Sequence, residues 1–395
     1  MYQVNTQLTK EFDKPISKGK LDIINKTRSN LFAWRGQFSP QLVEVILSAY
    51  CLPGSVILDP FAGSGTVLPE AAILEFEAHG FEINPAAWIL SKTYEFINDS
   101  RRKEYINAVR KLVDQEFPFR VLDQDSEVED LSGKLKAIRN SLNQESKRIL
   151  EALVILLDVA NNKVTNELIQ SKFTDLASLI ENLPYSSKQI SVGLSDARSL
   201  PLERDCIDFI VTSPPYINVF NYHQNYRRSA EILGWDLLKI ARSEIGSNRA
   251  NRGNRFYTVI QYCLDMADTL RELSRVAKSE ARIVLVVGYE SNVLSVPFYN
   301  ADIIERIGIS ANLFRRTLRQ KREFKNKFGK VIREDIINFS NLNNETRKET
   351  VEQIARDVAF DVLGRGLSSV PSKNLASLED AIDKVQDIGR TPILE

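Results

Sequence analysis

Apolar residues recur through the first hundred positions in blocks whose spacing predicts alternating helices and strands. The segment Gln41–Ala49 places its apolar residues on one face of a 3.6-residue period: Leu42, Val43, Ile46 and Leu47. The short apolar run Ser55–Asp59 predicts a strand that ends in an acid, and a helix follows over about 66–75. His79–Ile83 then predicts a second short strand that ends near another acid.

The pattern changes over residues 100–189, which are helical in character and nearly free of glycine. Within this stretch Ile149–Leu157 is apolar enough to predict a buried helix. Lys and Arg balance Asp and Glu over residues 101–190, with 14 of each. We therefore expect a helical insertion between two strands of a sheet.

Strand patterns resume at Gln189–Val192, Cys206–Val211 and Ala281–Gly288. Strands that alternate with helices predict an α/β fold with a mostly parallel sheet. The expected organisation is an N-terminal extension (1–30), a sheet domain (31–99 and 190–340) interrupted by the helical insertion (100–189), and a C-terminal helical segment (341–395). A helix is expected near residues 345–363 of that last segment.

Composition excludes several classes of protein. Three cysteines without a CxxC pair and only two histidines among 395 residues argue against a disulfide framework or a zinc site, and no metal is expected. The chain lacks an apolar run of about 18 residues, and its first residues lack the pattern of a signal peptide. We expect a cytoplasmic protein with no membrane span.

The segment Asp59–Thr66 reads Asp-Pro-Phe-Ala-Gly-Ser-Gly-Thr and joins the first strand to the following helix. Gly63 and Gly65 allow a tight turn and a close approach of the backbone to a ligand. The free N–H groups of the helix beyond them suit an anionic or polar ligand. Alone, such a loop also occurs as a plain strand-to-helix turn. It is neither a Walker loop nor a GxGxxG motif.

Two further acids follow strands. Glu82 comes 17 residues after Gly65, near the spacing at which an acid accepts hydrogen bonds from ribose hydroxyls in doubly wound sheets. Asp196 follows the Gln189–Val192 strand, where an acid could accept from the amino group of an adenine ring. All three motifs are expected along the carboxyl edge of one sheet, where such folds bind ligands.

The segment Ser213-Pro214-Pro215-Tyr216 ends the strand Cys206–Val211. Neither proline has an N–H group, so strand pairing stops and the carbonyl groups of this segment are presented in a fixed geometry. The Ser213 side chain and the Pro214 carbonyl could accept both N–H groups of a nucleobase amine. Tyr216 could stack on a base that has left its duplex. As an isolated tetrapeptide, this segment would equally suit a proline turn.

Taken together, Asp59–Thr66 and Thr212–Tyr216 resemble the amino-methyltransferases of DNA, the N4-cytosine and N6-adenine family. The segment Phe38–Val43 resembles the part of that family that closes over the methionine end of the cofactor, and Phe81–Pro85 resembles its ribose-binding strand end. The resemblance implies a Rossmann-like, doubly wound sheet of about seven strands with a reversed last hairpin, and S-adenosylmethionine as methyl donor. The cofactor-binding residues it implies are Phe38, Ser39, Asp59, Pro60, Phe61, Ala62, Gly63, Ser64, Gly65, Thr66, Glu82, Ile83, Asn84, Asp196 and Ala197. The catalytic residues are Ser213, Pro214, Pro215 and Tyr216.

The expected activity is methyl transfer to the exocyclic amine of a flipped base in double-stranded DNA. Ser213 at the first position of the tetrapeptide is more typical of cytosine-N4 enzymes, whereas Asp or Asn is more typical of adenine-N6 enzymes. Alternatives are an adenine-N6 enzyme, a guanine-N2 methyltransferase of tRNA or rRNA, and a non-enzymatic DNA-binding subunit. A cognate restriction endonuclease is a possible partner.

Local clusters of positive charge suggest where nucleic acid would bind. Nine Lys and Arg residues fall within 315–333 against one acid, Glu323, and a second basic stretch spans 242–255. Such clusters neutralise phosphates, although a solvated basic helix face would give the same pattern. The predicted DNA-binding residues are Arg249, Arg252, Arg255, Arg315, Arg316, Arg319, Lys321 and Arg322.

Overall fold

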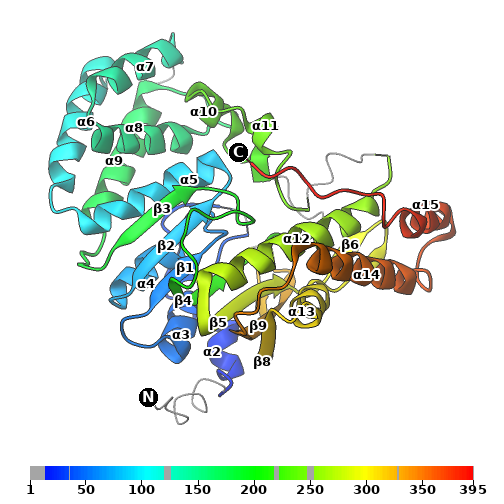
Figure 1. Cartoon of the computed structure of the whole chain (residues 1–395). Coiled ribbons are helices and arrows are strands. Elements are labelled where there is room, and N and C mark those ends of the chain that lie inside the picture. The colour runs from blue at the N-terminus through cyan, green and yellow to red at the C-terminus, as the bar shows by residue number, and fades with distance from the viewer. Residues whose placement is uncertain are drawn as a thin grey trace.

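The structure is a computed structural model, and it describes residues 14–34, 36–119, 126–217, 222–246, 253–326 and 329–394. It contains a seven-stranded sheet with the order β3-β2-β1-β4-β5-β9-β8 (Figure 1). The strands are β1 (Val56–Asp59), β2 (Glu77–Glu82), β3 (Ile190–Leu194), β4 (Ile207–Thr212), β5 (Ala277–Gly288), β8 (Phe314–Lys325) and β9 (Val331–Asn341). A small hairpin of β6 (Ser291–Val293) and β7 (Val296–Phe298) stands apart from this sheet.

The predicted α/β class is confirmed by the pairing of these strands. Strands β1 to β5 pair in parallel, whereas β9 runs antiparallel to both β5 and β8. The chain proceeds outward from β1 through β2 to β3, then returns to place β4 on the other side of β1. This reversal creates a switch point at the carboxyl ends of β1 and β4, which is where open α/β sheets bind their ligands.

Helices cover both faces of the sheet because its central strands are apolar on both faces. Ile57 and Phe209 belong to one buried core, while their neighbours Leu58 and Ile210 belong to the other. The first core includes α3 (Pro40–Tyr50), α4 (Val67–Ile73) and α5 (Pro85–Lys92). The second includes α12 (Tyr257–Val276), α13 (Asn300–Ser310), α14 (Lys348–Gly366) and α15 (Ser372–Asp383).

The α-helices that follow α5 and precede β3 form the lobe at the upper left of Figure 1: α6 (Arg102–Glu116), α7 (Leu131–Ser141), α8 (Gln144–Leu157) and α9 (Asn166–Glu181). Three of them begin at residues whose side chains accept a backbone N–H of the first turn, Asp130 for α7, Asn143 for α8 and Thr165 for α9. Helix α8 carries the apolar run at 149–157, and its buried residues join the first core. The lobe is thus packed continuously onto the α5 side of the sheet.

Segments from both ends of the described chain return to the sheet. Helix α2 (Lys18–Asp22) lies against β8, where Asp22 accepts a hydrogen bond from the backbone N–H of Glu323 at 2.7 Å. After α15, the chain runs back across α12 toward α11 (Leu237–Ile240), as the red segment in Figure 1 shows. The remaining short helices are η1 (Thr93–Asn98), η3 (Tyr222–Gln224) and α10 (Arg227–Ile232).

The observed elements correct two details of the sequence analysis. The second strand spans 77–82 rather than 79–83, so Glu82 is its last residue. The basic stretch at 315–333 is a strand hairpin, β8 and β9, so a helix face does not explain its charge pattern. Among the described residues, no helix is long and apolar enough to cross a membrane.

Candidate active site

The glycine loop turns sharply between β1 and α4, and both of its glycines have positive φ, +53° for Gly63 and +89° for Gly65. At Gly65 the close packing of the loop also requires glycine, because a Cβ atom would lie 2.8 Å from the ring of Tyr94 and 2.9 Å from the Cβ of Ser91. The loop is tied to the end of β2 by the hydrogen bond from Ala62 N to Phe81 O. Its shape is therefore fixed by the neighbouring elements.

Two buried carboxyl groups flank this loop. Glu82 accepts hydrogen bonds from the backbone N–H groups of Gly63 and Asn84, both at 2.8 Å. Asp59 accepts from the hydroxyl of Thr212 at 2.6 Å and from Phe61 N at 3.2 Å. Burial raises the pKa of each carboxyl to about 7, against the lowering effect of these hydrogen bonds. A cationic or hydrogen-bonding ligand would therefore change the protonation of both carboxyl groups near neutral pH.

The segment Ser213–Tyr216 leaves β4 beside the glycine loop, because β4 pairs directly with β1. The hydrogen bond between Thr212 and Asp59 joins the two motifs at the switch point. The ring of Tyr216 lies against Gly288, where a Cβ atom would approach it to 2.9 Å. Burial raises the pKa of Tyr216 well above its usual value, and the charge of Glu334 adds to this.

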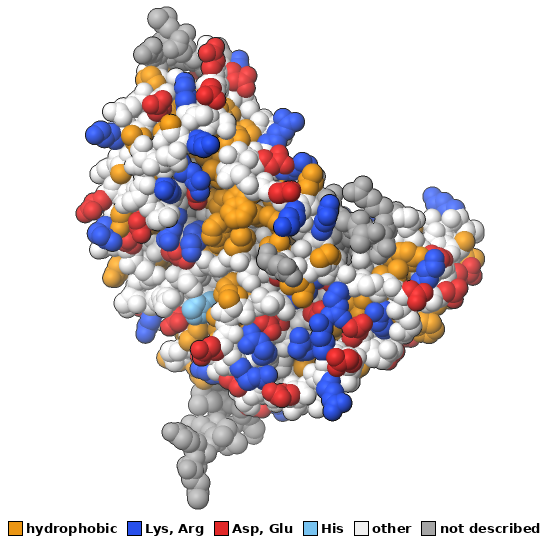
Figure 2. Space-filling view, turned by 45° about the horizontal axis from the view of Figure 1, so that its top comes forward, with side chains coloured by type: hydrophobic (Ala, Val, Ile, Leu, Met, Phe, Trp, Pro, Cys, Tyr) orange, Lys and Arg blue, Asp and Glu red, His pale blue; other side chains and the backbone are white. Residues whose placement is uncertain are grey.

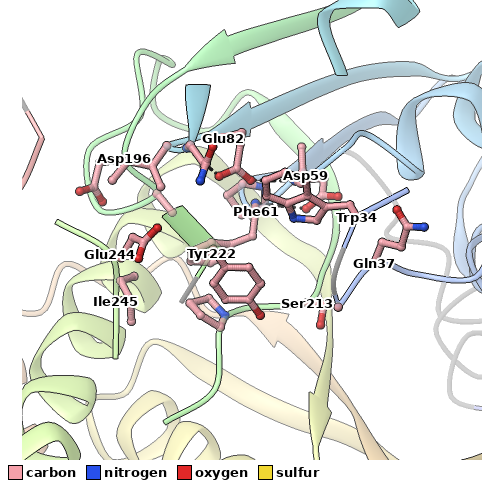
Figure 3. A pocket seen from close by; sticks show the side chains of 18 of the residues that line it. Trp34, Gln37, Asp59, Phe61, Glu82, Asp196, Ser213, Tyr222, Glu244 and Ile245 are labelled. Carbon is pink, nitrogen blue, oxygen red and sulfur yellow. Dashed lines mark hydrogen bonds between the residues drawn. The ribbon is translucent and has the colours of Figure 1, made fainter. Parts of the chain in front are cut away.

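A cavity of about 870 Å³, including its open mouth, lies over these carboxyl ends (Figure 3). Small-molecule sites typically enclose ~300–1,000 Å³. Predicted site residues that line the cavity are Phe38, Asp59, Pro60, Phe61, Ala62, Gly63, Thr66, Glu82, Ile83, Asn84, Asp196, Ala197, Ser213 and Pro215. Of the other predicted residues, Ser64 donates to Gln37 Oε1 at 2.8 Å, whereas Ser39, Gly65, Pro214 and Tyr216 are not among the residues lining the cavity.

Other lining residues come from segments without a recognisable motif: Trp34, Gly36, Gln37, Ser195, Tyr222, Ser243, Glu244 and Ile245. Trp34 stacks on Tyr226, with ring centroids 6.2 Å apart. Glu244 is buried beside His223, whose Nδ1 lies 3.0 Å from Glu244 Oε2. Ser243, Glu244 and Ile245 fall within the basic stretch 242–255, which stands out in the sequence for its charge and not for a cofactor motif.

Asp196 lies in the cavity wall, but its carboxylate is engaged by a neighbour. Arg198, whose side chain is fully buried, contacts Asp196 Oδ1 at 2.9 Å and Oδ2 at 2.6 Å. The same guanidinium reaches Asp265 at 2.9 Å and the hydroxyl of Thr391 at 2.6 Å. The Asp196–Arg198 pair thus fastens residues 390–394 to the rim of the cavity.

A second cleft adjoins the cavity and shares Gly36, Gln37, Phe38 and Ser213 with it. Its opposite wall comes from the hairpin of β8 and β9, including Arg322 and Glu334. These two residues are 3.5 Å apart between Nε and Oε2, and Arg322 Nε is buried without a hydrogen-bond partner among the described residues. Ser213 therefore stands between two concave sites.

The predicted DNA-binding arginines of β8 fall into two groups toward opposite ends of the strand. Arg322 lies opposite Glu334 of β9, and Glu334 lies opposite Gly288 at the carboxyl end of β5. We call this end of the sheet, which faces the cavity, the site edge. Arg315 lies seven residues earlier along the strand, about 20–24 Å away at the rise of an extended chain. Arg316 lies beside it and pairs with Glu305, and Arg319 pairs with Glu305, Asp302 and Asp335.

Lys321 lies beside Arg322 in β8, and Arg255 lies just before α12. Lys321 and Arg255 are exposed, while Arg249 and Arg252 lie outside the described residues. On the face shown in Figure 2, Lys and Arg side chains are interspersed with Asp and Glu. Among the described residues, no group of His, Cys, Asp and Glu is arranged to hold a metal ion.

A model of the family described as DNA methylase, with N6 and N4 specificities, matches residues 9–92, which include β1, the glycine loop and the end of β2. This match and the relatives below support an amino-methyltransferase of the N4/N6 family. The chain is 19% identical to the Type II methyltransferase M.MjaII of Methanocaldococcus jannaschii, over 69% of this chain and 74% of the relative. It is 22% identical to M.BsoBI of Geobacillus stearothermophilus, over 55% of this chain and 54% of the relative.

Among solved structures, a SAM-dependent methyltransferase from Methanosarcina mazei aligns with a TM-score of 0.35 and 13% identity, over 75% of this chain and 97% of its own. At this TM-score the likeness bears on neither fold nor function.

The methyl donor of the matched family is S-adenosylmethionine, and the cavity of this chain fits it. Two buried polar atoms in the wall, Asn84 Nδ2 and Glu244 Oε1, have no hydrogen-bond partner among the described residues. They supply a donor and an acceptor for a polar ligand, and Glu82 and Asp59 supply further acceptors. The chain itself thus provides a cavity whose wall combines apolar side chains with several polar groups.

Proposed function

We propose that this amino-methyltransferase transfers a methyl group from S-adenosylmethionine to N4 of cytosine in double-stranded DNA. One observation carries the proposal. Ser213 lines both the cofactor cavity and the second cleft, so a donor in the cavity and a base in the cleft would meet at this residue. Proximity and orientation of this kind supply much of the acceleration in group transfer.

The side chains act by holding a weak nucleophile in a reactive geometry. When bound, S-adenosylmethionine supplies an electrophilic methyl group. Ser213 Oγ and the Pro214 carbonyl accept the two N–H groups of the target amine, so that its lone pair turns out of the ring plane and toward the cavity. The amine proton released on methylation leaves through these acceptors to the water of the cleft. The short prolyl segment keeps both acceptors fixed.

Cytosine is the preferred target because Ser213 occupies the first position of the tetrapeptide, as is typical of the N4 enzymes in the resemblance described above. The cleft supplies polar groups for the rest of the base edge. Arg322 can donate to the ring nitrogen and carbonyl oxygen of cytosine, while Glu334 holds the guanidinium in place. A base must leave the duplex to enter such a cleft.

DNA would lie along the site edge of β8 and β9. Lys321 and Lys325 are exposed near Arg322 on this edge, and Lys325 also lines the cleft. These side chains can neutralise phosphates on either side of the flipped nucleotide. Arg255, which is exposed, is a further proposed DNA contact, and the predicted contacts Arg249 and Arg252 lie outside the described residues. Arg315, Arg316 and Arg319 are better explained by their acidic neighbours.

The relatives named above are Type II methyltransferases, and on that basis we propose that this enzyme protects a recognition site from a cognate restriction endonuclease. The site would be methylated on both strands of the host DNA. Extracts of the source cells should then cleave unmodified DNA and spare DNA modified by this enzyme.

The decisive experiment is nucleoside mass spectrometry of DNA from cells that express the protein. N4-methylcytosine is expected with the wild type and not with Asp59→Ala, whereas Arg315→Ala, altered at the far edge of β8, should retain it. N6-methyladenine in its place would correct the target base. A new N2-methylguanosine in RNA, without a modified DNA base, would refute the assignment to DNA.

A further inference from the structure

The cavity contains one buried acceptor that neither the motifs nor the proposed reaction uses. Glu244 is 7% exposed and lies in the turn that follows α11, outside every recognisable motif. It lines the cavity, yet its Oε1 atom has no hydrogen-bond partner among the described residues. A buried carboxylate oxygen without a donor is costly, so its presence in a ligand cavity indicates that a ligand supplies the donor.

The other oxygen of Glu244 is held in place by a chain of hydrogen bonds. Gln224 Nε2 lies 2.8 Å from His223 Nε2, so the amide N–H donates to that ring nitrogen. The ring proton is then on Nδ1, which donates to Glu244 Oε2 at 3.0 Å. This arrangement fixes the carboxylate while Oε1 remains available to the cavity.

The acid first expected to read the adenine ring is committed elsewhere. Both oxygens of Asp196 receive N–H groups of Arg198, and Oδ2 also receives Leu394 N at 3.3 Å. The Arg198 side chain is fully buried and cannot release this carboxylate without losing its own partner. Asp196 is thus a structural anchor at the rim.

Figure 3 shows Glu244 beside Asp196 and Ile245 at one end of the cavity, with Ser213 at the other end and Glu82 between them. A methyl donor whose sulfonium lies near Ser213 and whose ribose lies near Glu82 would present its adenine ring at the Glu244 end. The exocyclic amine of adenine is a donor, and it matches an oxygen that only accepts.

We propose that Glu244, and not Asp196, accepts a hydrogen bond from the exocyclic amine of the adenine ring of the methyl donor. This inference rests on S-adenosylmethionine as the cofactor, but not on which base the enzyme methylates. Glu244 is then the residue that selects an adenosyl ligand over ligands with a 6-oxo purine.

The test uses calorimetric binding to the full-length protein, without DNA or turnover. Two ligands differ at this edge of the purine: S-adenosylhomocysteine carries the exocyclic amine and an unprotonated N1, and S-inosylhomocysteine carries an oxo group beside an N1–H. The wild type should prefer the adenosyl ligand by about tenfold or more, since a hydrogen bond to a charged group is replaced by two facing acceptors. Glu244→Gln should bind the adenosyl ligand about tenfold more weakly and lose most of this preference, because its amide N–H can donate to the oxo group.

Asp196→Asn is the matched control, and it should lower stability while keeping the preference for the adenosyl ligand. The inference is overturned if Glu244→Gln weakens both ligands equally, or if Asp196→Asn abolishes the preference and Glu244→Gln retains it. Glu244→Asp, which keeps the charge but withdraws the oxygen by one methylene, should behave as Glu244→Gln does toward the adenosyl ligand. Wild-type protein that binds neither ligand would refute the cofactor itself, a failure distinct from any change in preference.

Discussion

Alanine at Gly65 should destabilise the protein through a clash that alanine at another positive-φ glycine does not create. Gly65 has φ +89°, and its Cβ would lie 2.8–2.9 Å from Tyr94 and Ser91. Both neighbours are buried, at 2% and 0% exposed, so neither can move freely. Gly234 has a similar φ of +93°, but a Cβ there would meet nothing within 4 Å. Comparing Gly65→Ala with Gly234→Ala therefore separates the cost of backbone strain from the cost of overpacking.

The expected magnitudes follow from these contacts. A left-handed conformation costs an L-residue roughly 1–2 kcal/mol, and this term applies to both variants. Alanine also removes about 0.4–1 kcal/mol of unfolded-state entropy in both, which partly offsets the strain. Overpacking adds about 1–3 kcal/mol at Gly65 alone. Gly65→Ala should therefore be less stable than Gly234→Ala by about 1–3 kcal/mol.

Urea unfolding followed by circular dichroism measures this difference as a lower midpoint for Gly65→Ala. Calorimetry with S-adenosylmethionine should show weaker binding, by about tenfold or more, because a shifted loop loses the hydrogen bond from Gly63 to Glu82. Gly234→Ala should bind as the wild type does. Equal midpoints for the two variants, or unchanged affinity in Gly65→Ala, would refute the close-packing explanation.

Four other predictions test the site. Burial raises the pKa of Asp59 and Glu82 to about 7 in the folded protein, so donor binding should strengthen from about pH 6 to about pH 8 and release protons below pH 7. Calorimetry in buffers of different ionisation enthalpy measures the number of protons released, and a value of zero would contradict the prediction. Because of the same pKa shifts, the folded protein holds protons that the unfolded chain has lost between about pH 4 and about pH 7, so the stability of the ligand-free protein should fall as pH rises through this range. A melting temperature that rises across this range would contradict the prediction. Ser213→Ala should slow single-turnover methylation by about 10–100-fold while leaving the donor Kd within about twofold, and an unchanged rate would remove Ser213 from the reaction. Arg322→Met should weaken productive DNA binding by about tenfold without changing donor affinity, and the opposite pattern would place Arg322 with the cofactor.

The elements that carry motifs could be predicted from the sequence because they are short apolar strands with glycines or acids at their ends. The turn at Gly63 and Gly65, the acid at Glu82 and the prolines after β4 each have a local physical cause that can be read without neighbours. Their convergence at one sheet edge follows from parallel pairing. The fold class and the core of the site were therefore predictable.

The remaining features depend on partners far away in the chain. The edge strand β8 lacks a clear alternation of apolar and polar residues, because acids such as Asp302 and Asp335 stabilise its arginines. Glu244 and Tyr222 lie in segments without a motif and reach the cavity only through tertiary packing. Asp196 was expected to face a ligand, but the engagement of its carboxylate by Arg198 also involves Thr391, almost 200 residues away.

The order of strands also affects how this protein emerges from the ribosome. Strand β1 pairs with β4, and the partners Ile57 and Phe209 are 152 residues apart in the chain. At a synthesis rate of about 5–20 residues per second, the inner edge of β1 waits roughly 8–30 s for its partner. The helices α6–α9 are made during this interval, and they can fold from local contacts. Until β4 arrives, the apolar strand at the centre of the future sheet is an open edge, which makes the nascent chain a natural client for chaperones.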